Sequence, residues 1–203
     1  MEALLPPEVG PLVAAVLMAI SFLGSLITAA FGIGGGVVVA WTFFPRDFSN
    51  PLAPGRDEYA FDSWLKIASS GVITVAVPQL EMGQGITTIL PQVIAAELGA
   101  DWRQIAVEPA PVSGTYANVP LAAEWAPLWM PLAAGLAQGD DPMLARRFAE
   151  NSRFTATADG TSLEAFEEPC RFAAASARAM LAKAAGRQWD VAWEEGEAGA
   201  GFI

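Results

Sequence analysis

Histidine is absent from this 203-residue sequence, and cysteine occurs once, as Cys170. A single cysteine cannot form a disulfide within the chain, and it cannot supply the set of about four thiolates that holds an iron–sulfur cluster. Without histidine, we do not expect a zinc or haem centre bound by side chains, or a histidine general base. A cofactor held by backbone and amide groups remains compatible with these absences.

Basic residues are also scarce. Lysine and arginine number 11 against 22 aspartates and glutamates, which gives a net charge of −11 at pH 7. Nucleic acid is therefore not an expected partner, because binding to its phosphates needs a positive protein face. Apolar residues make up 53% of the chain, more than in a typical soluble domain. The length allows one domain, or one domain plus an anchor.

Charge is missing altogether from residues 11–44. Residues 11–31 are apolar on all faces and long enough for a helix that crosses the hydrocarbon core, which takes about 20 residues. We therefore predict a hydrophobic membrane anchor over residues 1–44, with one transmembrane helix. A buried core helix and a signal peptide are the alternatives, although a signal peptide begins with a basic region and no Lys or Arg precedes Arg46.

The remainder divides by composition. Residues 45–60 are rich in proline, glycine and charge and predict a linker, and residues 61–203 form the predicted body. Within the body, residues 64–68 and 72–77 alternate between apolar and smaller or polar side chains and flank Ser69-Ser70-Gly71. This pattern predicts a β-hairpin with one buried face.

A helix is predicted over residues 86–98, because its apolar positions recur close to every 3.6 residues and Gly99 suits its C-terminal cap. Pro91 lies inside it and would bend the axis unless it falls in the first turn. Residues 104–109 read as a short strand. The order of strand, strand, helix and strand predicts an α+β (mixed α/β) body.

Two further helices are expected over residues 143–149 and 163–186, and a final edge strand over residues 189–193. Thr161 and Ser162 are interpreted as an N-cap of the last helix. We interpret Tyr116, Asn118 and Cys170 as structural or packing residues.

The motif Glu81-Met82-Gly83-Gln84-Gly85 lies between the strand predicted over residues 72–77 and the helix predicted over residues 86–98. At such a turn, backbone N–H groups are unpaired and the helix dipole favours an anion. Glycine allows close approach to the backbone, and Gln84 supplies an amide that both donates and accepts hydrogen bonds. Glu81 is interpreted as a structural partner of backbone or arginine rather than as an acid/base carboxylate.

Around this motif, residues 41–193 resemble the N-terminal portion of the molybdopterin-binding large subunit of the xanthine dehydrogenase/aldehyde oxidase family, in its isoquinoline 1-oxidoreductase beta-subunit type. The resemblance rests on the Glu81–Gly85 motif with the segments that precede and follow it in order, which are residues 64–68, 95–102, 107–111, 116–118 and 169–181.

The resemblance implies that Gln84 lies beside a molybdenum centre and hydrogen-bonds one of its oxygen ligands, while Gly83 and Gly85 help to hold the pterin. It implies molybdopterin with molybdenum, in the cytosine dinucleotide form. The family hydroxylates an aldehyde or N-heterocycle with water as the oxygen source. The partners implied are the remaining large-subunit portion on a second chain, a 2Fe-2S small subunit, a cytochrome c and the membrane, with the body in the periplasm. The arginines after the anchor weakly favour the cytoplasm instead, so the orientation stays open.

Two departures limit the resemblance. The catalytic glutamate of the family, near its far C-terminus, has no counterpart here, so we assign no catalytic residue and no protein metal ligand to this chain. Ala158 and Asp159 stand where relatives carry glycines, and a carboxylate near a phosphate would repel it. The alternatives are an inactive truncated product, or a membrane-anchored assembly or binding module. Residues 25–39 are also similar to the first transmembrane segment of sulfite-exporter-type permeases, so a fragment of such a permease is a further alternative.

Overall fold

The computed structural model describes residues 18–24, 48–139 and 141–196, in two compact units that divide after Asp47. Residues 18–24 are helical, and the rest of the predicted membrane-spanning segment lies outside the described residues. Within the described ranges, every helix is too short or too polar to span a bilayer. The predicted transmembrane helix therefore gains no support from the structure.

The second unit is built on a four-stranded mixed sheet in the order β1 (Glu58–Phe61), β2 (Leu65–Ala68), β3 (Ile73–Val77) and β4 (Ile105–Pro109). The first three strands are antiparallel neighbours, whereas β4 runs parallel to β3. A parallel neighbour needs a crossover connection, and α3 (Ile86–Leu98) supplies it. The predicted hairpin, helix and third strand are thereby confirmed, as is the mixed α and β character of the body.

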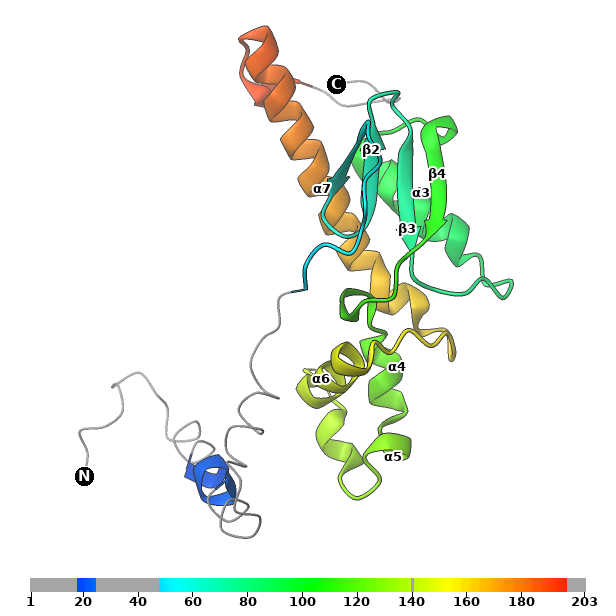
Figure 1. The fold of residues 1–203 in the computed structure, drawn as a ribbon, viewed down its shortest axis with the longest axis vertical. Helices are drawn as coiled ribbons and strands as arrows, with labels where there is room; N and C mark the ends of the chain where they lie inside the picture. The colour runs from blue at the N-terminus through cyan, green and yellow to red at the C-terminus, as the bar shows by residue number, and fades with distance from the viewer. Residues whose placement is uncertain (1–17, 25–47, 140, 197–203) are drawn as a thin grey trace, which may run out of the picture. The chain divides into compact units, whose positions relative to one another are not determined.

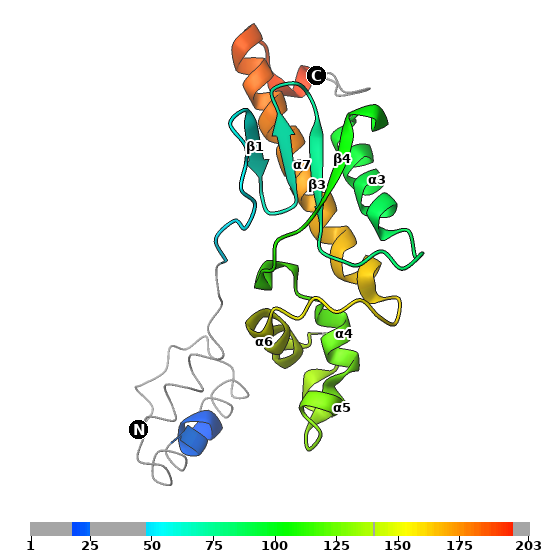
Figure 2. The same cartoon turned by 45° about the vertical axis from the view of Figure 1, so that its right-hand side comes forward.

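Two helices cover one face of this sheet. The long helix α7 (Thr161–Trp189) packs against α3, and both lie on the same side of the strands (Figures 1 and 2). The core forms between these layers, where Leu65 and Val75 of the sheet meet Leu90 and Ile94 of α3, and all four side chains are fully buried. Full burial of each such side chain stabilises the fold by roughly 1.5–3 kcal/mol relative to exposure.

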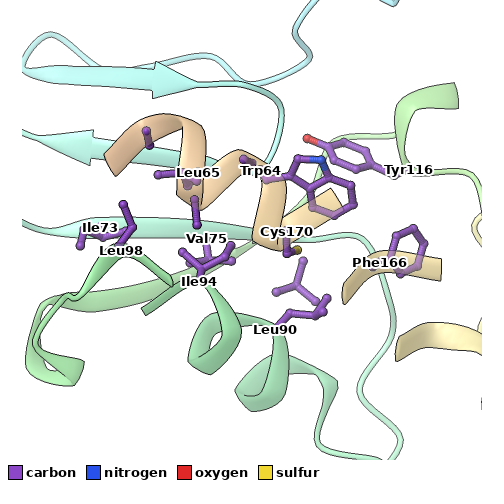
Figure 3. Close-up of a cluster of buried hydrophobic side chains, with 14 of the residues drawn as sticks. Trp64, Leu65, Ile73, Val75, Leu90, Ile94, Leu98, Tyr116, Phe166 and Cys170 are labelled. Atoms are coloured by element: carbon purple, nitrogen blue, oxygen red, sulfur yellow. The ribbon is translucent and has the colours of Figure 1, made fainter. Parts of the chain in front are cut away.

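An aromatic cluster lies at one end of this core, on the right in Figure 3. Trp64 meets Tyr116 edge-to-face with ring centroids 5.2 Å apart, and Phe166 lies 5.7 Å from the same indole. The hydroxyl of Tyr116 donates to the carbonyl oxygen of Ser63. Tyr116 precedes a smaller helical layer, made of α4 (Val119–Glu124), α5 (Ala126–Trp129), η3 (Ala134–Ala137) and α6 (Met143–Ser152). This layer has its own small apolar cluster.

Three local features differ from the sequence prediction. Strand β1 begins at Glu58, inside the predicted linker, because pairing with β2 orders residues that carry too short a pattern to predict a strand. Residues 189–193 do not form a strand, since α7 runs to Trp189, Asp190 takes a left-handed conformation at φ 56°, and a 3₁₀ turn, η4 (Trp193–Glu195), follows. The N-cap of α7 is Gly160, with Thr161 already inside the helix.

Candidate functional site

The Glu81–Gly85 motif forms the loop between β3 and α3, as predicted. Gly85 is the N-cap of α3 with φ 80°, and Gly83 has φ 96°. Both glycines occupy the left-handed region that other residues rarely adopt. A side chain at Gly83 would meet nothing within 4 Å, so that edge of the loop is open to another molecule. The chain therefore places Gln84 on a loop whose shape depends on the glycines at each side.

The side-chain amide of Gln84 is fixed within this loop while the residue stays exposed. Its Oε1 accepts from the N–H of Met82 at 2.6 Å, and its Nε2 donates to the carbonyl oxygen of Leu80 at 2.7 Å. A glutamine amide carries two N–H hydrogens, and the second finds no acceptor among the described residues. The side-chain amide of Gln84 is thus held in one orientation, and its second N–H hydrogen can still donate to another molecule.

The side-chain carboxylate of Glu81 folds back onto the start of α3 and binds backbone N–H groups there. Its Oε1 accepts from the N–H groups of Gly83 and Gly85 at 2.8 and 2.9 Å. Its Oε2 accepts from the N–H of Thr87 at 3.2 Å and from the Thr87 hydroxyl at 2.9 Å. The bonds from Gly85 and Thr87 hold the pKa of Glu81 at about 2. The interpretation of Glu81 as a partner of backbone groups is confirmed.

This arrangement changes what the loop can offer to an anion. The sequence placed free N–H groups at the start of α3, but the anion that they bind here is the carboxylate of Glu81. A phosphate at the same position would face a negative charge and donors already in use. The loop stays open beside Gly83, and one hydrogen of the Gln84 amide has no acceptor among the described residues, whereas the N–H of Gly85 is bound to Glu81.

A second loop, residues 154–160, packs against the beginning of the first. The N–H of Leu80 donates to the hydroxyl of Thr157 at 3.1 Å, and the buried amide of Gln79 bonds the carbonyl oxygen of Thr155 and the hydroxyl of Ser162. The sequence singled out both loops separately and gave no sign that they are neighbours. Their contact brings the altered glycine positions into the same region as Gln84.

Asn118 ties this second loop to α4. It is fully buried, its Nδ2 donates to the carbonyl oxygen of Ala156 at 3.0 Å and to the hydroxyl of Thr161 at 2.9 Å, and its Oδ1 accepts from the N–H of Leu121 at 3.2 Å. The interpretation of Asn118 as a structural residue agrees with these bonds. Thr161 serves this network rather than the predicted cap.

Asp159 has a partner of its own. It takes φ 53°, and its carboxylate accepts from the indole N–H of Trp125 at 2.8 Å. Asp159, at the position where the resemblance implies a glycine, has a left-handed backbone, which aspartate tolerates better than most residues. The loop thus has a backbone that suits glycine and carries a charge.

A groove of about 440 Å³ lies beside both loops, at the carboxyl ends of the parallel strands β3 and β4. Its walls are residues 77–80, 109–110 and 155–157. Ligands of α/β sheets commonly bind outside the carboxyl ends of parallel strands. The groove is lined up to Leu80, directly before the Glu81–Gly85 motif, and residues 81–85 are not part of its walls.

The larger cleft, about 880 Å³, lies elsewhere and was not foreseen from the sequence. It is lined by the beginning of α7 and by the smaller helical layer. Among the described residues of its lining are four glutamates (Glu124, Glu150, Glu164 and Glu168) and one basic residue, Arg146. Excess negative charge opposes an anionic cofactor. The charge of this cleft therefore makes it a poorer candidate for an anionic cofactor than the Gln84 loop.

Cys170 belongs to the core rather than to any site. Its side chain is fully buried among the core residues of α7, and burial raises the pKa of the thiol to about 12. A buried, protonated thiol is a poor nucleophile and a poor metal ligand. The interpretation of Cys170 as a packing residue agrees with this burial.

Comparison with known proteins gives the loop a context. Residues 28–123 match the model of a family described as "Molybdopterin cofactor-binding domain", a range that contains the Glu81–Gly85 loop and begins inside the predicted anchor. Isoquinoline 1-oxidoreductase subunit beta of Brevundimonas diminuta is 29% identical over 140 residues, which are 69% of this chain and 14% of that protein. The membrane-bound aldehyde dehydrogenase [pyrroloquinoline-quinone] of Gluconacetobacter polyoxogenes is 31% identical over 114 residues, 53% of this chain. The chain spans 14% of the length of each of these relatives.

Proposed function

We propose, from the premise that this chain belongs to the molybdopterin cofactor-binding domain family, that it supplies part of the cofactor-binding body of a molybdenum-dependent oxidoreductase. The observation that carries the proposal is the state of Gln84. Its amide is locked by Leu80 and Met82, is exposed, and keeps one hydrogen for a further acceptor. An amide fixed before a ligand arrives loses little side-chain freedom on binding.

Gln84 and the open side of Gly83 are the groups that would meet the cofactor. The amide hydrogen of Gln84 would bind one of the oxygens of the metal centre, and the missing side chain at Gly83 would let the pterin approach the backbone. When bound, molybdopterin with molybdenum, which we propose in its cytosine dinucleotide form, supplies the redox chemistry that hydroxylates an aldehyde or N-heterocycle with oxygen from water.

Activity would require a second chain. We propose that this second chain carries the remaining portion of the large subunit, since the present chain spans 14% of the length of each relative. An apolar surface supports such assembly, because Leu128, Leu132 and Leu136 are 76%, 100% and 69% exposed on α5, η3 and the segment between them. Three leucines gathered on one exposed segment favour a covering partner, which we propose is the remaining large-subunit portion. Electrons would then leave through a 2Fe-2S subunit and a cytochrome c.

We further propose that the assembly lies at a membrane, with its body in the periplasm. The uncharged residues 11–44 support a membrane location, as does the similarity to the membrane-bound aldehyde dehydrogenase of Gluconacetobacter polyoxogenes.

The second candidate is an assembly or binding module without activity of its own. The observation that favours it is the charge around the loops, since Glu81 takes the donors at the start of α3 and Asp159 adds a carboxylate on the neighbouring loop. Both features reduce the number of groups available to an anionic cofactor.

The deciding experiment is co-purification of the detergent-solubilised chain with its native partners, followed by molybdenum analysis. Stoichiometric metal with a large partner supports the oxidoreductase, and absence of both overturns it. Gln84→Ala should then lower turnover strongly at unchanged folding. Gln92→Ala, which removes an exposed amide of α3, is the matched control and should leave turnover unchanged.

A further inference from the structure

The carboxylate of Glu81 reaches both neighbours of Gln84. A single oxygen, Oε1, accepts from the N–H groups of Gly83 and Gly85 at 2.8 and 2.9 Å. These two residues flank Gln84 in the chain, so one atom fixes the backbone on each side of it. The other oxygen holds Thr87 on the first turn of α3.

The amide of Gln84 is held by different groups. Leu80 and Met82 bind the side chain, and neither bond involves Glu81. The side-chain bonds can form only where the backbone of Gln84 brings the amide back toward Leu80. Because both flanking glycines can adopt many conformations, the backbone has little reason to stay in this one without the carboxylate.

We propose that Glu81 is the positioning residue for Gln84, and that it also closes the start of α3 to external anions. Four hydrogen bonds fill the acceptor sites of its two oxygens. The inference deepens the proposed function, since it assigns the cofactor contact of this loop to Gln84 and withholds it from the helix start. It concerns hydrogen bonds within the chain, however, so it is testable without molybdenum.

The experiment compares the full chain with its Glu81→Ala variant by amide NMR, with sodium formate as the probe and sodium chloride at equal ionic strength as the reference. Removal of the carboxylate should move the side-chain NH₂ signals of Gln84 toward those of a free glutamine. Formate should then bind in a saturable manner at the amides of Gly83, Gly85 and Thr87, and should restore the Gln84 signals.

Two internal controls separate positioning from general loss of structure. The NH₂ signals of the exposed Gln92 on the same helix should not move in any sample. Glu168→Ala removes an exposed carboxylate that accepts no hydrogen bond from described residues, and it should produce neither the Gln84 change nor formate binding. A variant of Glu81 that loses only overall stability would shift both glutamines alike.

Each outcome decides the inference. Saturable formate binding at these amides in the wild-type chain would show that the start of α3 is open, and would overturn it. A folded Glu81→Ala variant with unchanged Gln84 signals would do the same. If that variant does not fold, Glu81→Gln, which keeps one acceptor oxygen, replaces it, and absence of a formate effect at Thr87 then counts against the inference. Failure of the chain to bind molybdenum would leave these results unaffected and would concern only the proposed function.

Discussion

Replacement of Asn118 by alanine should loosen the loop that packs against the Gln84 loop. Asn118 is fully buried and its side chain makes three hydrogen bonds, to Ala156, Thr161 and Leu121. Alanine removes all three and fills none of the vacated positions. The backbone N–H of residue 118, which donates to Phe154 at 2.7 Å, is retained. The perturbation therefore acts on the side-chain network and leaves the local backbone bond in place.

The expected loss of stability follows from these bonds. Each buried hydrogen bond contributes about 1 kcal/mol net, so loss of three predicts a decrease of about 3 kcal/mol in the free energy of unfolding. The N-cap of α4 is among them, since Asn118 accepts from Leu121; loss of a cap alone costs about 1 kcal/mol. A folded unit of this size should then melt roughly 6–12 °C lower. Native domains have about 5–15 kcal/mol of stability, so the variant should still fold.

Denaturant unfolding followed by circular dichroism measures this loss, with Asn151→Ala as the control. Asn151 is exposed near the end of α6, and its replacement should change stability by less than about 0.5 kcal/mol. Hydrogen exchange at the N–H of Leu80, which donates to Thr157, should also accelerate in the Asn118 variant. A decrease below about 1 kcal/mol, or unchanged exchange at Leu80, would refute the reasoning.

Three further outcomes follow from charged and ionisable groups. Burial raises the pKa of Cys170 to about 12, so iodoacetamide at pH 8 should modify it only in the denatured chain, and rapid labelling of the native chain would contradict its burial. The pKa of Glu81 is lowered from 4.5 to about 2, so the stability that its carboxylate contributes to the folded chain is fully present above pH 4.5 and is lost as the pH falls toward 2. An NMR titration of the Gly85 amide with a midpoint near pH 4.5 would contradict this. Lys66→Met should lower the free energy of unfolding by about 2 kcal/mol, because the ammonium bonds Glu108 at 2.8 Å and lies 3.4 Å from Glu58; unchanged stability in denaturant unfolding would exclude a stabilising role.

Much of the sheet layer could be predicted because its signals are local. The alternation in β2 and β3, the period of α3 and the glycine at residue 99 each act over a few neighbouring residues, and the structure reproduces them. Strand β1 could not be predicted, since its four residues are ordered by pairing with β2 rather than by their own pattern. The edge strand predicted over residues 189–193 was wrong, because α7 extends to Trp189, a 3₁₀ turn begins at Trp193, and none of the described strands pairs with this segment.

The candidate site was predictable only in part. Its position and its glycines follow from the motif, but the bonds of Glu81 to Gly85 and Thr87 depend on a side chain folding back over the loop. The contact of Leu80 with Thr157 joins residues far apart in the sequence. Such contacts depend on how α7 packs against the sheet. The hydrophobic periodicity of the sequence gives no information about that packing.

Competition for donors limits how this site can bind an anion. Glu81 is attached to the same loop as the N–H groups that it binds, so its effective concentration beside them is far above that of a free ligand. An external phosphate would have to displace it and would gain no more donors than the carboxylate already has. The remaining hydrogen of Gln84 faces no such competitor. Asp159 is likewise engaged by Trp125, so the charge on the second loop has a local partner. It follows that cofactor affinity in this chain should depend more on Gln84 than on the start of α3.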